Sequence, residues 1–128
     1  MPIRLSTALR SVMADALASN MGSSTMSVYT GTQPATPATA ASGTKLVDIA
    51  VASWNAAVSG AAALNTTTPN NGVAVASGTA GWARLIVGTN IIDGTVGTTG
   101  TDFTINTAAI VNGATVTLTA CTITQPAS

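Results

Sequence analysis

Near the N-terminus, hydrophobic side chains recur at three- and four-residue spacings, the pattern of a helix with one apolar stripe. The stripe comprises Leu5, Leu9, Val12, Met13, Ala16 and Leu17. This pattern predicts a helix over residues 5–20, with Ser6 or Thr7 as its N-cap. Asn20 and Gly22 are expected to end it in a left-handed conformation. We expect the stripe to cover an open face of the remaining domain, and to act as an interface only if the folded protein exposes it.

Beyond Met26 the pattern changes to short runs rich in β-branched residues, separated by Gly, Pro, Asn and Asp. Such runs are typical of strands in a β-sandwich. Strands are predicted over residues 26–30, 45–52, 56–64, 73–76, 81–87, 90–93, 102–106 and 109–124. The chain is therefore predicted to be a single domain over 1–128. Its expected fold class is mainly β, with an antiparallel, jelly-roll-like β-sandwich over 26–124 and one N-terminal α-helix.

Asn112-Gly113 is the best turn signal, because both positions tolerate a positive φ. It lies between Ile110-Val111 and an alternating run over 115–120, and so predicts a hairpin. Weaker turns of the same chemistry are expected at Asn71-Gly72 and Asp93-Gly94.

The strand that follows this turn alternates in character. Val116, Leu118 and Ala120 are expected to share the buried face, with Thr side chains on the other. Ile123 then falls on the Thr face, and a β-bulge near Cys121 would return it to the core.

Residues 32–43 contain Pro34 and Pro37 and show no hydrophobic period. We predict an exposed connecting arm here, because proline is excluded from central strands. A segment of this composition costs little to order, so it is the first candidate for reaching a neighbouring molecule.

Charged residues make up only 6% of the chain, and the formal net charge is +0. Four basic and four acidic side chains create no basic field that would gather nucleic acid or anionic lipid. Polar residues or Gly interrupt every apolar run before the roughly 18 residues that a membrane-spanning helix needs. We therefore expect neither nucleic acid nor a membrane as a partner.

Hydrophobic residues amount to 46% but aromatic residues to only 3%. The core is therefore expected to be thin, because a buried Ala contributes far less than a buried Leu or Phe at about 25 cal/mol per Å². A marginally stable domain gains from a partner surface, and low charge favours permanent interfaces. The composition thus predicts a homo-oligomer or another stable assembly.

The chain has no His and no Glu, which are frequent general bases and metal ligands. The four aspartates, Asp15, Asp48, Asp93 and Asp102, are scattered and form no calcium loop. Without His, a hydroxyl nucleophile lacks the base that most often activates it. We therefore predict a protein that is not an enzyme, with no catalytic residues, no metal ligands and no cofactor.

Cys121 is the single cysteine, so the chain cannot form an internal disulfide, and synthesis in the cytoplasm is expected. Its thiol lies in a predicted strand and is expected to be a small buried hydrophobe. Trp82 and Arg84 lie two positions apart in another predicted strand. They are expected on one face, where Arg84 forms either a structural cation–π contact or a polar rim for the large ring.

Several segments resemble those of a group of small tailed-phage virion proteins. The first are Arg-Leu-Ser-Thr-Ala-Leu-Arg at 4–10 and Tyr-x-Gly-Thr-Gln-Pro at 29–34. The later ones are Gly-Trp-x-Arg at 81–84 and Asp-Gly-x-Val-Gly-Thr-x-Gly-x-Asp at 93–102. They occur in the right order and touch most of the chain. Ala83 stands where members often carry an aromatic residue, which lightens that part of the core.

This resemblance implies structural work in a virion, after synthesis in the host cytoplasm. Within that setting, the small size, thin core and low charge favour a capsid decoration, or cement, protein that binds the major capsid protein and stabilises the shell. A tail or tail-tip component that binds other tail proteins is the alternative. A carbohydrate-binding β-sandwich module is a further alternative, which the scarcity of aromatic residues disfavours.

Overall fold

A computed structural model describes residues 3–51, 54–65 and 70–124. They form one helix, α1 (Thr7–Asn20), and ten strands. The strands are β1 (Ser24–Tyr29), β2 (Lys45–Val51), β3 (Ala61–Ala63), β4 (Asn70–Val73), β5 (Gly78–Thr79), β6 (Trp82–Val87), β7 (Asn90–Gly97), β8 (Phe103–Ile105), β9 (Ala109–Ile110) and β10 (Thr115–Thr124). The predicted class, mainly β with one N-terminal helix, is confirmed.

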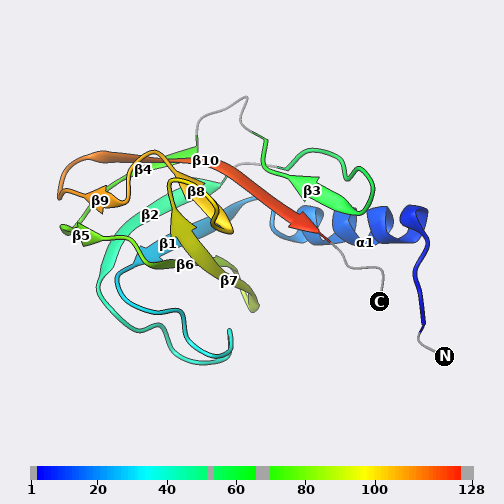
Figure 1. Cartoon of the computed structure of the whole chain (residues 1–128), viewed down its shortest axis with the longest axis horizontal. Coiled ribbons are helices and arrows are strands. Elements are labelled where there is room, and N and C mark those ends of the chain that lie inside the picture. Colours follow the sequence, from blue (N-terminus) through cyan, green and yellow to red (C-terminus); the bar gives the residue numbers. More distant parts are fainter. Residues whose placement is uncertain (1–2, 52–53, 66–69, 125–128) are drawn as a thin grey trace.

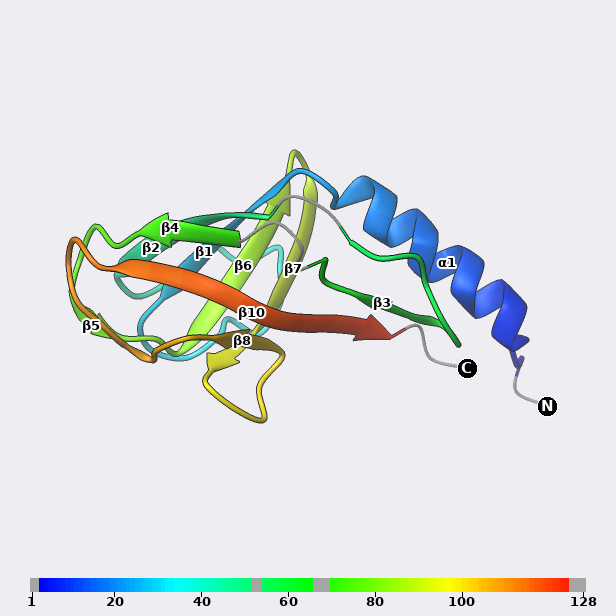
Figure 2. The ribbon, with the colours of Figure 1, turned by 90° about the horizontal axis from the view of Figure 1, so that it is seen from above.

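Most strands belong to one curled sheet, in the order β2-β1-β6-β7-β8-β10-β3. β4 pairs with β10 and also packs against β2, so distant parts of this path come together. Figures 1 and 2 show the long β10 crossing the layer formed by β1, β2 and β6. The neighbours are antiparallel except β7 and β8, which run parallel. The sheet is therefore mixed, whereas the sequence predicted antiparallel strands throughout.

The core lies inside this curl and uses the few large side chains of the chain. Trp82 is fully buried and stacks on Tyr29 with ring centroids 4.7 Å apart. The other large, fully buried side chains include Phe103, Met26, Leu46, Ile49 and Leu85. Burial of these side chains, and not of the many alanines, supplies most of the hydrophobic stabilisation.

Two of the predicted turns are wrong, because they lie inside strands. Asn71-Gly72 belongs to β4 and Asp93-Gly94 to β7. A Cβ atom at Gly72 would lie 2.0 Å from the Asp48 carbonyl oxygen. One at Gly94 would lie 2.7 Å from the Phe103 ring. Both glycines therefore permit close packing between elements, a use that a local turn signal does not reveal.

The predicted turn at Asn112-Gly113 forms, but the strands beside it pair elsewhere. Gly113 has a φ of 88°, and the Ala114 N–H donates to the Val111 carbonyl at 2.9 Å. However, β9 pairs with β5, whereas β10 pairs with β3, β4 and β8. The predicted hairpin pairing is wrong. β9 has only two residues, and both edges of β10 are occupied by the longer strands β3, β4 and β8.

The bulge expected in the last strand is present. Val116 and Leu118 are buried, and Cys121 is buried farther along. Between Leu118 and Ala120 the pairing of β10 with β8 shifts by one residue. The inward face therefore changes before Ala120, which is exposed and not buried as predicted.

The predicted strand over 56–64 is largely replaced by a tight turn. Ser59 and Gly60 have φ values of 53° and 80°, and Val58 and Ala61 exchange backbone hydrogen bonds across them. Only β3 remains of that strand. The strand predicted over 73–76 is displaced to β4, and residue 52 of the predicted strand 45–52 lies outside the described residues.

Candidate functional site

The helix α1 begins at the predicted cap. The Ser6 Oγ accepts a hydrogen bond from the Leu9 N–H at 3.1 Å. The predicted left-handed stop is wrong, because Met21 ends α1 with a φ of −101°. The Ser24 hydroxyl and the Trp54 indole N–H both donate to the Met21 carbonyl, at 2.8 and 3.1 Å. Side chains from elsewhere thus satisfy the end of the helix without a left-handed residue.

The inner face of α1 is made of alanine. Ala14 and Ala18 are buried and cluster with Ala62 of β3. Small side chains on both elements let the helix and the strand approach closely. β3 is the last strand of the curled sheet and pairs with β10, so α1 packs against this end of the sheet.

Two hydrogen bonds hold the segment before β3 along this inner face. The Asp15 carboxylate accepts from the Ala57 N–H at 2.7 Å. The Ser11 hydroxyl oxygen accepts from the Gly60 N–H at 3.0 Å. The polar side chains at the edges of the alanine face therefore satisfy loop backbone groups, and they fix which side of α1 faces inward.

The opposite side of α1, which we call the outer face, carries the larger hydrophobic side chains together with Ala16. It comprises Leu9, Val12, Met13, Ala16 and Leu17. Leu9 is 46% exposed, Val12 62% and Met13 38%. The expectation that this stripe covers the β domain is therefore wrong for Leu9, Val12 and Met13, whereas Leu17, at the C-terminal end of the stripe, packs against the core. The alanines take that role because they fit closely against β3, whereas the bulkier stripe would hold the elements apart. The sequence predicts an interface role for the stripe only if the folded protein exposes it, and Leu9, Val12 and Met13 are exposed.

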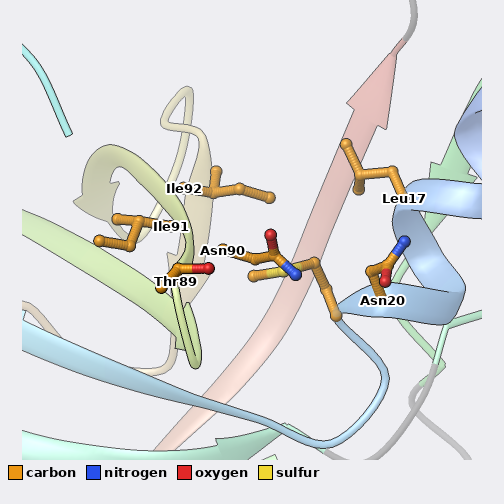
Figure 3. Close-up of a pocket in the computed structure, with 7 residues that line it drawn as sticks. Leu17, Asn20, Thr89, Asn90, Ile91 and Ile92 are labelled. Atoms are coloured by element: carbon orange, nitrogen blue, oxygen red, sulfur yellow. The ribbon is translucent and has the colours of Figure 1, made fainter. Parts of the chain in front are cut away.

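At its C-terminal end the outer face continues into a pocket of about 410 Å³. Figure 3 shows Leu17 and Asn20 of α1 across this pocket from the hairpin of β6 and β7, which contributes Thr89, Asn90, Ile91 and Ile92. Apolar and uncharged polar side chains line it. The pocket therefore extends the apolar surface of α1 onto the β body.

Charge is excluded from the outer face. α1 carries two charged residues, and both lie toward the inner side. Asp15 binds the Ala57 N–H, and the Arg10 guanidinium donates to the Thr7 hydroxyl at 3.0 Å. Within the described residues, no helix is long and apolar enough to cross a membrane.

The predicted arm over 32–43 is exposed over most of its length, as expected. The buried Arg84 holds it to the β body, because its guanidinium donates to the Thr39 carbonyl. Arg84 also lies over the Trp82 ring, 5.3 Å from its centroid. The predicted cation–π contact is thus confirmed, and the same arginine anchors the arm, which the sequence pattern did not reveal.

The four aspartates lie apart and bind different groups. Asp93 pairs with Arg84, and Asp102 accepts hydrogen bonds from the Thr95 N–H and hydroxyl. Burial acts to raise the pKa of Asp48, but hydrogen bonds from Ser27 and Lys45 outweigh it and hold that pKa below its ordinary value. Among the described residues, no three His, Cys, Asp or Glu side chains gather where they could hold a metal ion.

The thiol of Cys121 is buried in β10, as predicted. Burial raises its pKa to about 12, and the nearby Asp102 carboxylate adds to the rise. Because the thiolate is the reactive form, the thiol is held in its unreactive state at neutral pH.

β5 and β9 lie at the end of the β body away from α1 (Figure 1), and a second, smaller apolar group is formed by segments next to these strands. The Ala74 and Gly113 backbones bring its segments together, since the Gly113 N–H donates to the Ala74 carbonyl at 2.9 Å. Its exposed side chains are Val73, Val75 and Val111. They come from loops and strand ends and form no pattern that resembles the continuous outer face of α1.

One sequence signal could have identified the outer face: Ala14 and Ala18 are spaced to form a small-residue stripe opposite the larger one, and Ala61–Ala63 is a matching run.

Comparison of the chain with protein-family models, with curated proteins and with solved structures found no match.

Proposed function

We propose that this chain is a non-enzymatic structural protein of a tailed-phage virion, and that it decorates the capsid. The observation that carries the proposal is the outer face of α1, which presents Leu9, Val12 and Met13 to solvent. An exposed apolar surface of this kind marks a protein–protein contact. The segments that resemble small virion proteins supply the setting in which the contact would be used.

The distribution of charge also favours assembly over binding of a charged ligand. Lys45 pairs with Asp48, and Arg84 pairs with Asp93. Half of the eight charged residues therefore neutralise one another within the chain. What remains at the surface is mostly hydroxyl, small apolar and backbone groups, which suit close contact with another protein.

A decoration protein stabilises the shell by mass action. It binds the assembled lattice of the major capsid protein and not its separated subunits, so its binding free energy adds to particle stability. The exposed arm over 32–43 is the segment that we propose reaches the lattice, because it extends from the β body and is anchored at Thr39.

A tail or tail-tip component that binds other tail proteins is the second candidate, since the outer face of α1 would serve equally there. A carbohydrate-binding module is less well supported. Sugar binding needs exposed aromatic rings, and all four aromatic residues lie within the described part of the chain. Trp82 and Phe103 are buried, and Tyr29 and Trp54 are only partly exposed.

The copy number in purified virions tests the proposal. A decoration protein follows the symmetry of the shell, so we expect a copy number comparable to that of the major capsid protein. Particles that lack the chain should break at a lower temperature, and added purified chain should restore their heat resistance. A count of roughly a few to a few tens of copies, with unchanged heat resistance, would favour the tail component. Absence from virions would reject both.

A further inference from the structure

We infer that copies of this chain associate through the outer face of α1, with the α1 helices packed against one another in a bundle. The inference rests on the proposed function for its setting, a symmetric assembly, and it assigns the surface through which the expected homo-oligomer forms. The other occupants of this face, a different virion protein or none, are outcomes of the test below.

The outer face is accessible over most of the helix. α1 extends away from β1, β2 and β6 and runs beside β3 and the end of β10 (Figures 1 and 2). Among the described elements, β3 is the one that packs extensively on α1, and it does so on the alanine side. A helix from another copy can therefore lie along Leu9, Val12 and Met13 without meeting the β body of the chain that carries them.

The width of the outer face favours a bundle over a simple pair. At 3.6 residues per turn, the exposed arc from Val12 through Leu9 to Met13 spans about 100°. A two-stranded contact uses a narrower seam, whereas a wide arc allows each helix to contact two neighbours. α1 is 14 residues long, about 21 Å, so one helix pair alone would bury less than the roughly 1,200 Å² of a stable interface.

The composition of the face suits copies of itself. It carries no charge, so no like charges meet when identical faces pack together. Ala16 lies among Leu9, Val12 and Met13, and this small residue leaves room for a large side chain of the facing helix. A charged partner such as nucleic acid would find no complementary group on this face.

The experiment compares two variants that carry the same valine-to-lysine substitution at different positions. Val12, on the outer face, and Val111, at the far end of the β body, are both 62% exposed. The oligomeric state of the full chain, Val12→Lys and Val111→Lys is measured by sedimentation over a range of concentrations. We expect the natural chain and Val111→Lys to form trimers or larger oligomers. We expect Val12→Lys to be monomeric, or to associate at least about tenfold more weakly, with an unchanged circular dichroism spectrum.

A cysteine at Met13 provides an independent measurement. Cys121 is buried, so Met13→Cys offers one accessible thiol in the folded chain. Under mild oxidation we expect covalent dimers from Met13→Cys and none from Val111→Cys.

The inference is overturned by a natural chain that stays monomeric at all concentrations, or by an oligomer that Val12→Lys leaves intact. Oligomers disrupted by Val111→Lys would move the interface to the other end of the molecule, and dimers alone would reject the bundle. None of these results decides whether the chain binds virions. The copy number and heat resistance of particles answer that question separately, so the two failures are distinguishable.

Discussion

Arg84 binds Asp93 through two parallel hydrogen bonds, from Nε to Oδ1 at 2.7 Å and from Nη2 to Oδ2 at 2.9 Å. The two residues are partners in the ladder of β6 and β7, and their side chains are 7% and 1% exposed. Nη2 also donates to the Thr39 carbonyl at 2.8 Å. The hydrogen bond to Asp93 raises the pKa of Arg84 above its ordinary value. One guanidinium therefore joins two strands and the exposed arm.

Loss of the carboxylate from this pair should destabilise the fold strongly. Asp93→Asn leaves a buried guanidinium without its counter-charge, and we expect the free energy of unfolding to fall by about 3 kcal/mol. Denaturant titration measures this change. Lys45→Gln is the control, because it breaks the exposed pair with Asp48 and should have a much smaller effect. Equal effects of the two substitutions would show that the Arg84 pair is solvated.

The inward face of β10 can be tested at adjacent positions. Leu118 is buried and Thr117 is partly exposed. Leu118→Asp places a charge in the core, and we expect it to unfold the domain or to cost more than about 3 kcal/mol. Thr117→Asp should cost less than about 1 kcal/mol. Thermal unfolding of both variants gives the comparison, and similar tolerance of both would contradict the assigned face.

A methyl group at Gly72 should separate β4 from β2. The added Cβ would meet the Asp48 carbonyl oxygen, which belongs to the backbone and cannot turn aside. We expect Gly72→Ala to lower the free energy of unfolding by more than about 2 kcal/mol. Gly22→Ala is the matched control, because its added Cβ would meet neighbours at 3.6 Å, an ordinary contact distance. A mild Gly72→Ala variant would mean that the two strands do not approach so closely.

Cys121 should make stability depend on pH in the alkaline range. Its pKa is about 12 in the folded chain, above its ordinary value of 9.0. Folding therefore favours the protonated thiol, whose contribution is complete below pH 9 and is lost as pH rises toward 12. The loss approaches about 1.4 kcal/mol per pH unit within that window.

The difference between the natural chain and Cys121→Ser isolates this contribution, because other groups titrate equally in both. Urea unfolding at pH 8, 9 and 10 should therefore show a steeper alkaline decline for the natural chain. Parallel curves would mean that the thiol is solvated. Cys121→Ser should also leave assembly intact, since the thiol is buried in β10 and is not presented at the surface.

The sequence by itself determined the features that depend on neighbouring residues. The helical period and the Ser6 cap determine where α1 begins, and the prolines keep residues 32–43 out of the sheet. The bulge in β10 also follows from a local conflict, since Cys121 and Ile123 are out of step with Val116 and Leu118. The mainly β class follows from the many short β-branched runs.

Only the tertiary structure decided which of two apolar faces of α1 is buried. Periodicity shows that Leu9 and Met13 share one side and Ala14 and Ala18 the other. It contains no information about the surface opposite. The alanines face inward because β3 also presents alanine there, and because Asp15 and Ser11 bind backbone groups of a segment about forty to fifty residues away in the chain. Strand partners and the close approach at Gly72 likewise depend on segments distant in sequence, which no local pattern encodes.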